Sequence, residues 1–374
     1  MNYTLRCGLS EDAFEIKSAI GRAGQSASLL KRKVRWYQQT LKHAGILKRS
    51  NQRGIWQLTQ NSQLKENRGS IALIAFSTHL GVAIWGACRS VFDNMDAPIT
   101  LCVTSPPYPL RTARAYGNPT VERYVDFICA SLEPIVSTLT ADGSLCINIS
   151  NDIFESRSPA RSLYKERLVL ALHERLGLWK MDELIWHNPC KAPGPIQWAS
   201  KTRQQLNVSY EPILWFSPDP AKCKSNNRRV LQPHTESHLK YLASGQRKRV
   251  SHSDGAYVRR ESSYPLSLGR IPRNVLSYPH NCQDQSAYKQ SARFAGLEAH
   301  GAPYPLALVK FLIEFMTEKN DLVVDPFGGS MTTAKAAEIT NRRWISSEII
   351  HEYVVGGATR FNQSPGFNLN QHIL

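Results

Sequence analysis

The chain has 374 residues, a length that accommodates two or three domains. Hydrophobic residues make up 42% and charged residues 20%, an ordinary globular composition that excludes a disordered or fibrous chain. Forty-six Lys and Arg against 30 Asp and Glu give a formal net charge of +16, which points to a polyanionic partner.

The positive charge is concentrated in two parts of the chain. Residues 1–70 hold 13 basic and 4 acidic residues, and residues 199–298 hold 16 and 7. Tryptophan, tyrosine and histidine are interleaved with the basic residues in both regions, as is typical of surfaces that face nucleic acid. The alternative is that the charge serves solubility alone.

No membrane span, secretory signal or metal site is expected. The longest apolar stretch, residues 71–88, is interrupted by polar residues and glycine, so it does not resemble a transmembrane helix. No basic start followed by an apolar segment marks a signal peptide. The eight cysteines are scattered without a C-x-x-C pair, which disfavours a zinc cage and a disulfide scaffold and fits a cytoplasmic protein.

Residues 1–60 are expected to form three short helices followed by a β-hairpin. The helices are predicted over 10–22, 26–30 and 33–43, and the hairpin over 46–49 and 55–59. This order resembles a winged helix-turn-helix module, whose third helix would contact DNA. The candidate DNA-binding residues on that helix are Arg35, Gln38, Gln39 and Lys42. The alternative is a module that only packs on its neighbour or mediates dimerisation.

After a predicted linker over residues 61–81, short apolar runs alternate with amphipathic segments. Strands are predicted at 99–103, 144–149, 183–189, 321–330 and 344–349, and helices at 124–139, 161–176, 306–317 and 332–340. Such alternation is typical of an α/β fold with a parallel sheet. Between residue 189 and about residue 298 the apolar rhythm is lost, so this stretch is predicted to be an insertion in the sheet.

The first chemical motif is DPFGGSMTT at 325–333, which follows an apolar strand and opens a helix. Open α/β sheets bind ligands at this position. Gly328 and Gly329 allow the backbone to approach a ligand closely. Glu348, at the end of the next predicted strand, is suited to accept hydrogen bonds from ribose hydroxyls. The run lacks the lysine of a phosphate-binding loop, which disfavours a nucleoside triphosphatase.

The second motif is TSPPYP at 104–109, also at a strand end. The two prolines fix the backbone and lack N–H donors, which leaves carbonyl groups as acceptors. The Ser105 hydroxyl and the Pro106 carbonyl can together hold an amino group, while Tyr108 offers a flat stacking surface.

Together the two motifs resemble the β class of S-adenosylmethionine-dependent DNA amino-methyltransferases, and the PvuII-type cytosine-N4 methylases in particular. Further matching segments are YGNPTVERYVDF, ADGSLCINI, IWHNPCKAPGPIQW, GRIPRNVL and HGAPYPLALVKFLIEFMT. The resemblance covers roughly residues 82–360. It implies a Rossmann-like methyltransferase sheet with helices on both faces. Its catalytic part would span 82–198, a target-recognition region 199–298, and the cofactor-binding part 299–374.

The resemblance also implies roles for individual residues. Ser105, Pro106, Pro107 and Tyr108 would hold a flipped base. S-adenosylmethionine would lie against Asp325, Phe327, Gly328, Gly329, Ser330, Glu348, His300, Pro303 and Pro305. In the recognition region, Arg247, Lys248, Arg249, Arg259 and Arg260 would contact DNA phosphates. One departure is Gly86-Ala87-Cys88, where relatives carry an acidic residue.

The predicted activity is direct methyl transfer to the exocyclic amine of a flipped base in double-stranded DNA. Ser105 favours cytosine as that base. Adenine is the nearest alternative, although relatives acting on it usually carry Asp or Asn at position 105. Remoter alternatives are an RNA or protein-glutamine methylase and, because of Ala87, a DNA-binding regulator with a degenerate cofactor site. Covalent catalysis through Cys190 is disfavoured by its surroundings. A cognate restriction endonuclease and a monomeric or homodimeric state are further expectations.

Overall fold

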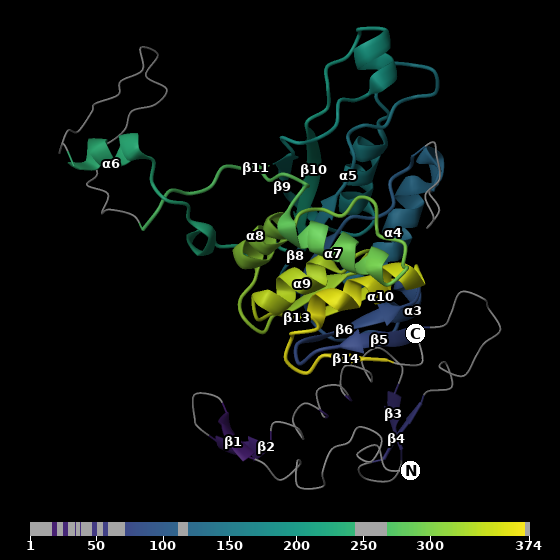
Figure 1. Ribbon diagram of the computed structural model, residues 1–374, viewed down its shortest axis with the longest axis vertical. Coiled ribbons are helices and arrows are strands. Elements are labelled where there is room, and N and C mark those ends of the chain that lie inside the picture. The colour runs from purple at the N-terminus through teal and green to yellow at the C-terminus, as the bar shows by residue number, and fades with distance from the viewer. Residues whose placement is uncertain are drawn as a thin grey trace.

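The computed structural model describes the greater part of the chain. The described residues are 17–20, 25–28, 34, 38, 47–50, 55–58, 72–110, 119–243 and 268–370. Their main feature is one large mixed sheet covered by helices on both sides (Figure 1). No described helix combines the length and apolarity that a membrane crossing requires.

Ten described strands form the large sheet. In spatial order they are β11 (Val275–Ser277), β9 (Trp179–His187), β10 (Tyr210–Ser217), β8 (Leu139–Asn148), β7 (Ile99–Thr104), β12 (Leu322–Asp325), β13 (Arg343–Glu348), β6 (Gly81–Trp85), β5 (Leu73–Ser77) and β14 (Asn368–Leu369). Strands β8, β7, β12, β13 and β6 run parallel. Strand β10 runs antiparallel to both of its neighbours, β8 and β9.

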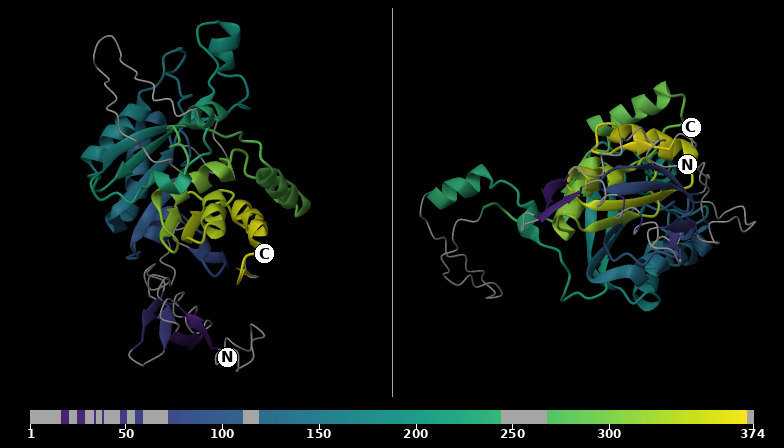
Figure 2. Two further views of the ribbon diagram at one scale, coloured as in Figure 1. Left: turned by 90° about the vertical axis from the view of Figure 1, so that its left-hand side faces the viewer. Right: turned by 90° about the horizontal axis from the view of Figure 1, so that it is seen from below.

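The helices divide into two layers, which Figure 1 and the two views of Figure 2 show on opposite faces of the sheet. One layer holds α3 (Cys88–Phe92), α4 (Val121–Thr138) and α5 (Tyr164–Glu174); the other holds α7 (Gln283–Phe294), α8 (Leu306–Met316), α9 (Thr332–Ile339) and α10 (His351–Ala358). The 3-10 helix η5 (Thr359–Phe361) continues α10, and Phe361 is buried in the core of the second layer. The remaining short helices are α6 (Glu236–Ala243), the π-helix η3 (Ile196–Lys201) and the 3-10 helix η4 (Asn227–Val230).

The central strands are apolar on both faces because each face meets a helical layer. Leu101 and Val103 of β7 join the core beneath α8, α9 and α10, whereas Ile99 and Cys102 join the core beneath α3, α4 and α5. All four side chains are at most 3% exposed. This double burial explains why the run ITLCV reads as a continuous apolar segment in the sequence.

The chain order reverses between β7 and β12. From β7 the chain proceeds outward to β8 on one side, and from β12 it proceeds to β13 on the other. At such a switch point the loops following the two strands diverge and leave a crevice at the carboxyl edge of the sheet. The two chemical motifs follow β7 and β12, so the topology places both motifs at this crevice.

The strands and helices predicted for residues 99–189 and 306–349 are confirmed, except that the strand predicted over 321–330 ends at Asp325. Two expectations for the remainder of the sheet were wrong. Residues 73–77, predicted as linker, form β5, which pairs with β6. Residues 210–217 and 275–277, predicted as part of an irregular insertion, form β10 in the middle of one half of the sheet and β11 at its edge. Pro212 breaks the apolar alternation in β10, which obscured this strand.

The N-terminal predictions had mixed outcomes. The hairpin is confirmed as β3 (Leu47–Arg49) paired with β4 (Trp56–Leu58). Helices predicted over 10–22 and 26–30 are contradicted by strands β1 (Lys17–Ile20) and β2 (Gln25–Ser28), which pair antiparallel. The glycines at 21 and 24 favour a turn between short strands over a continuous helix. In the third predicted helix, the two described residues, Val34 and Gln38, are helical.

The β6–β13 pairing depends on a close approach at Gly81, and this gives a stability prediction. A Cβ atom at Gly81 would lie 2.2 Å from the Trp344 ring and 2.3 Å from the Trp344 carbonyl oxygen. Because Trp344 is buried, Gly81→Ala is expected to lower the free energy of unfolding by about 2 kcal/mol. Urea unfolding measures this change. An unaltered midpoint would show that β6 and β13 can move apart at this position without a loss of stability.

Candidate active site

A cavity of about 420 Å³ opens at the carboxyl edge of the sheet, at the switch point between β7 and β12. Its lining comprises Ala87, Cys88, Ser105, Pro106, Pro107, Tyr108, Leu110, Phe127, Ser150, Asp152, Lys191, Glu211, His300, Ala302, Pro303, Tyr304, Pro326, Phe327, Gly328, Gly329, Ser330, Thr332, Glu348 and Ile349. Both sequence motifs therefore contribute to one cavity, and its volume suits a small-molecule ligand.

A buried carboxylate beneath the cavity joins the two motifs. Asp325, the last residue of β12, accepts hydrogen bonds from the Thr104 hydroxyl at 2.7 Å and from the Phe327 amide at 3.0 Å. Its second oxygen accepts from the Thr333 hydroxyl at 2.6 Å and from the Tyr304 hydroxyl at 3.1 Å. Burial raises the pKa of Asp325, and hydrogen bonds from Thr333 and Thr104 oppose this shift.

One end of the cavity is organised by Glu348, at the end of β13. One carboxylate oxygen accepts the Gly329 amide and the other accepts the Ile350 amide, both at 2.8 Å. Burial raises the pKa of Glu348, and these backbone hydrogen bonds favour its ionised form. A carboxylate accepts about four hydrogen bonds, so acceptor capacity is left for hydroxyl groups of a ligand in the cavity.

The glycines of the first motif bring the backbone close to its neighbours. Gly329 has a φ of +50°, and a Cβ atom there would lie 3.3 Å from Nε2 of His300. A Cβ atom at Gly328 would lie 2.1 Å from the Ser346 hydroxyl oxygen of the neighbouring strand. Larger residues would therefore displace this loop from the edge of the cavity.

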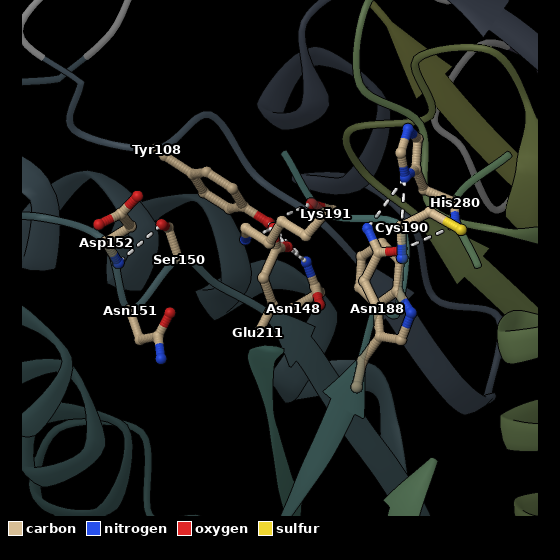
Figure 3. Close-up of polar contacts among 12 residues, drawn as sticks. Tyr108, Asn148, Ser150, Asn151, Asp152, Asn188, Cys190, Lys191, Glu211 and His280 are labelled. Carbon is tan, nitrogen blue, oxygen red and sulfur yellow. Dashed lines mark hydrogen bonds and ion pairs between the residues drawn. The ribbon is translucent and has the colours of Figure 1, made fainter. Parts of the chain in front are cut away.

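The other end of the cavity is built around the Tyr108 hydroxyl (Figure 3). This hydroxyl lies 3.2 Å from the Ser105 hydroxyl and donates to a Glu211 carboxylate oxygen at 3.1 Å. The Asn148 amide donates to the Tyr108 hydroxyl and, at 3.0 Å, to the same Glu211 oxygen. Burial and the nearby Glu211 charge raise the pKa of Tyr108 well above its ordinary value, which keeps the phenol protonated.

Glu211 and Lys191 are cavity residues that sequence reasoning missed. The Lys191 ammonium lies 2.8 Å from the second Glu211 oxygen, and both side chains are about one-fifth exposed. Glu211 lies in the antiparallel strand β10, and Lys191 lies in the segment before η3. Glu211 is 103 residues from Tyr108 in the chain. The available signal was an acidic residue at the start of an apolar run, YEPILWFS.

Most predicted catalytic and cofactor residues line the cavity. Asp325 and Pro305 are the exceptions, because Asp325 serves the buried network and Pro305 precedes α8 as its N-cap. Among the predicted DNA-binding residues, Gln38 is described as helical. The others lie outside the described residues: Arg35, Gln39, Lys42, Arg247, Lys248, Arg249, Arg259 and Arg260.

Comparisons with known proteins identify the family of the chain. The family model described as DNA methylase, covering N6 and N4 enzymes, matches residues 99–358, and the chain belongs to this family. The type II methyltransferase M.PvuII of Proteus hauseri is 31% identical over 77% of this chain and 85% of its own. The M.BglII methyltransferase of Bacillus subtilis is 25% identical over 71% and 64%.

A solved structure agrees as well. The PvuII DNA methyltransferase, described as cytosine-N4-specific, superposes with a TM-score of 0.59 at 30% identity. The match covers 76% of this chain and 87% of that structure. The mixed α/β sheet with its helical layers is thus a methyltransferase fold.

S-adenosylmethionine is the cofactor of this family, and the Glu348 end of the cavity fits it. The remaining acceptor capacity of Glu348 suits ribose hydroxyls, and Phe327 and Ile349 supply apolar surface beside it. Ala87 also lines the cavity, so the chain presents a methyl group at this point of the wall.

The position of Glu348 gives a prediction for cofactor binding. Glu348→Gln exchanges one acceptor oxygen for a donor that faces a backbone N–H, so the dissociation constant for S-adenosylmethionine should rise at least about tenfold. Isothermal titration calorimetry measures this constant. Glu352→Gln, an exposed change in the first turn of α10, is the matched control. Equal affinities for the two variants would remove Glu348 from the cofactor site.

Proposed function

We propose that this chain methylates the exocyclic N4 amine of cytosine in double-stranded DNA by direct displacement. The observation that carries the proposal is that Glu348 and the Ser105–Tyr108 loop line the same cavity. The Glu348 end suits the cofactor, and the Ser105–Tyr108 end suits an amino group. S-adenosylmethionine, when bound, supplies an electrophilic methyl group on a sulfonium. The protein's residues must provide the rest of the catalysis.

The target amine is a poor nucleophile because its lone pair is delocalised into the aromatic ring. Acceptors at Ser105 and at the Pro106 carbonyl draw the amine hydrogens out of the ring plane and favour a tetrahedral nitrogen. The same acceptors stabilise the positive charge that develops on the nitrogen. Holding the amine in line with the methyl group removes a further part of the barrier.

The base must leave the duplex to enter the cavity at the carboxyl edge of the sheet. Base flipping costs a few kcal/mol, and the Tyr108 ring on the cavity wall offers a stacking surface that offsets this cost. Tyr108 is held by its hydroxyl to Glu211 and Asn148, so its ring is fixed before the base arrives. A fixed ring loses little side-chain entropy when the base stacks on it.

Cytosine is favoured over adenine by Ser105 and by the similarity to a cytosine-N4-specific enzyme. The deciding experiment is mass spectrometry of nucleosides from DNA incubated with the protein and S-adenosylmethionine. N4-methylcytosine is the expected product. N6-methyladenine alone would overturn the base assignment and leave amino-methylation standing, and unmodified DNA would overturn the proposed function.

Ser105→Ala tests the proposed contact with the amine. We expect the single-turnover rate to fall by about hundredfold, in line with the loss of one stabilising group in a preorganised site. Cofactor affinity should change little, because Ser105 lies at the end of the cavity away from Glu348. Rapid-quench measurement of labelled methyl transfer gives the rate, and a near-normal rate would exclude Ser105 from the reaction.

The basic regions support further proposals about DNA recognition. Residues 1–60 would act as a winged-helix-like DNA-binding module, and the recognition region would lie between β10 and β11, because both strands belong to the sheet. The type II relatives suggest a role beside a restriction endonuclease in a bacterial cytoplasm.

Removal of residues 1–60 tests the first of these proposals. The truncated protein should bind DNA more weakly, and the slope of log affinity against log salt should fall by about one for each lost phosphate contact. Methyl transfer at saturating DNA should be retained. Fluorescence anisotropy over a salt series measures the slope, and an unchanged slope would indicate that this segment faces protein instead of DNA.

A further inference from the structure

The hydrogen bonds around Tyr108 fix the direction in which the Ser105 hydroxyl points its proton. Tyr108 has one hydroxyl proton, and Glu211, a carboxylate with only acceptor atoms, receives it at 3.1 Å. Asn148 donates to the same Tyr108 oxygen. In the contact of 3.2 Å between the two hydroxyls, Ser105 is therefore the donor.

This direction matters for the reaction. A Ser105 hydroxyl that donates to Tyr108 turns its lone pairs toward the cavity, where a target amine needs an acceptor. If the Tyr108 proton pointed at Ser105 instead, the Ser105 proton would face the amine and repel it. The orientation of both hydroxyls thus depends on the charge of Glu211, which is two hydrogen bonds away from Ser105 and three from the amine.

Lys191 holds Glu211 in the required place. Its ammonium group pairs at 2.8 Å with the Glu211 oxygen that does not contact Tyr108. The two Glu211 oxygens therefore have separate tasks, one toward Lys191 and one toward Tyr108 and Asn148. Figure 3 shows Lys191, Glu211, Asn148 and the Tyr108 hydroxyl converging at this point.

We propose that Glu211, held by Lys191, is a positioning residue that makes Ser105 an acceptor for the target amine and takes up the proton that the amine loses. This inference rests on the proposed function and deepens it. Ser105 itself is uncharged, so Glu211 supplies the negative charge that stabilises the developing positive charge on the amine nitrogen.

The proton transfer follows the hydrogen bonds that the structure shows. As the nitrogen forms its bond to the methyl carbon, the C–S bond of the sulfonium breaks and its electron pair stays on sulfur. The N–H bond of the amine breaks, and the proton joins the Ser105 oxygen. The Ser105 proton passes to the Tyr108 oxygen, and the Tyr108 proton passes to Glu211. Both hydroxyls are restored, Glu211 becomes neutral, and Lys191 keeps its charge. Glu211 is 19% exposed and then releases the proton to solvent.

A double-mutant cycle tests the proposal with a readout that a merely structural role would not produce. The variants are Glu211→Gln, Ser105→Ala and the two combined, assayed for single-turnover methyl transfer to a duplex at saturating DNA and S-adenosylmethionine. Glu211→Gln should lower the rate by about hundredfold alone. In the Ser105→Ala background the same change should cost less than about threefold, because Glu211 acts through Ser105.

Glu183→Gln is the matched control. Glu183 lies on the neighbouring strand β9, pairs with Lys165 at 3.0 Å and does not line the cavity, so its replacement should leave the rate unchanged. Dissociation constants for DNA and S-adenosylmethionine should be the same for all variants. Should Glu211→Gln fail to fold, Tyr108→Phe replaces it in the cycle, because it interrupts the same chain of hydroxyls and keeps the ring.

The outcomes separate the inference from the function on which it rests. Equal losses from Glu211→Gln in both backgrounds, or a loss confined to DNA affinity, would overturn the role of Glu211 alone. A wild-type protein that transfers no methyl group to DNA would overturn the proposed function and this inference together. A loss that depends on Ser105 would support both.

Discussion

The site depends on one buried carboxylate that ties together two distant parts of the chain. Asp325 ends β12 and accepts a hydrogen bond from the Thr104 hydroxyl at the end of β7, so the loops that follow the two strands start from a shared point. Its other contacts fix α9 through Thr333 and the segment before α8 through Tyr304. A buried carboxylate with four donors tolerates little displacement, because a donor left without its partner costs about 1–3 kcal/mol.

This constraint explains why the two ends of the cavity face each other. Ser105 directly follows Thr104, and Phe327 and Gly328 follow Asp325 by two and three residues. Under the proposed function, any shift of β12 against β7 would move the methyl donor relative to the target amine. Such a displacement would lower the reaction rate, because the reacting atoms must lie about 3–3.5 Å apart and in line. The Asp325 network is thus a positioning device, although Asp325 does not line the cavity.

The antiparallel strand β10 adds a second feature, the Glu211 carboxylate beside the Tyr108 hydroxyl. Because β10 runs antiparallel between β8 and β9, its first residues lie at the carboxyl edge of the parallel strands. Glu211, the second residue of β10, therefore reaches Tyr108 and Asn148 at the cavity. In a parallel strand, only residues at the end of the strand would lie at this edge. The antiparallel strand brings a residue from its beginning into a site built from strand ends.

Local sequence signals predicted the parallel core and both motifs. Runs such as ITLCV are apolar because helices cover both faces of the sheet, and the glycines of DPFGGS mark a close backbone approach. The Glu211–Lys191 pair was not predictable in this way, because its relation to Tyr108 arises from strand order over 103 residues. The role of Asp325 escaped prediction for a related reason, since its partners come from three other segments. At the N-terminus, apolar spacing suggested helices where glycine-flanked strands form.

The most direct test of the account is a crystal structure of the protein with a non-reactive analogue of S-adenosylmethionine and a duplex that contains the methylation site. The account predicts a cytosine flipped into the cavity, stacked on Tyr108, with its N4 amine about 3 Å from the Ser105 hydroxyl and the Pro106 carbonyl. The ribose of the analogue should contact Glu348. An amine held elsewhere in the cavity, or an analogue bound away from Glu348, would contradict it.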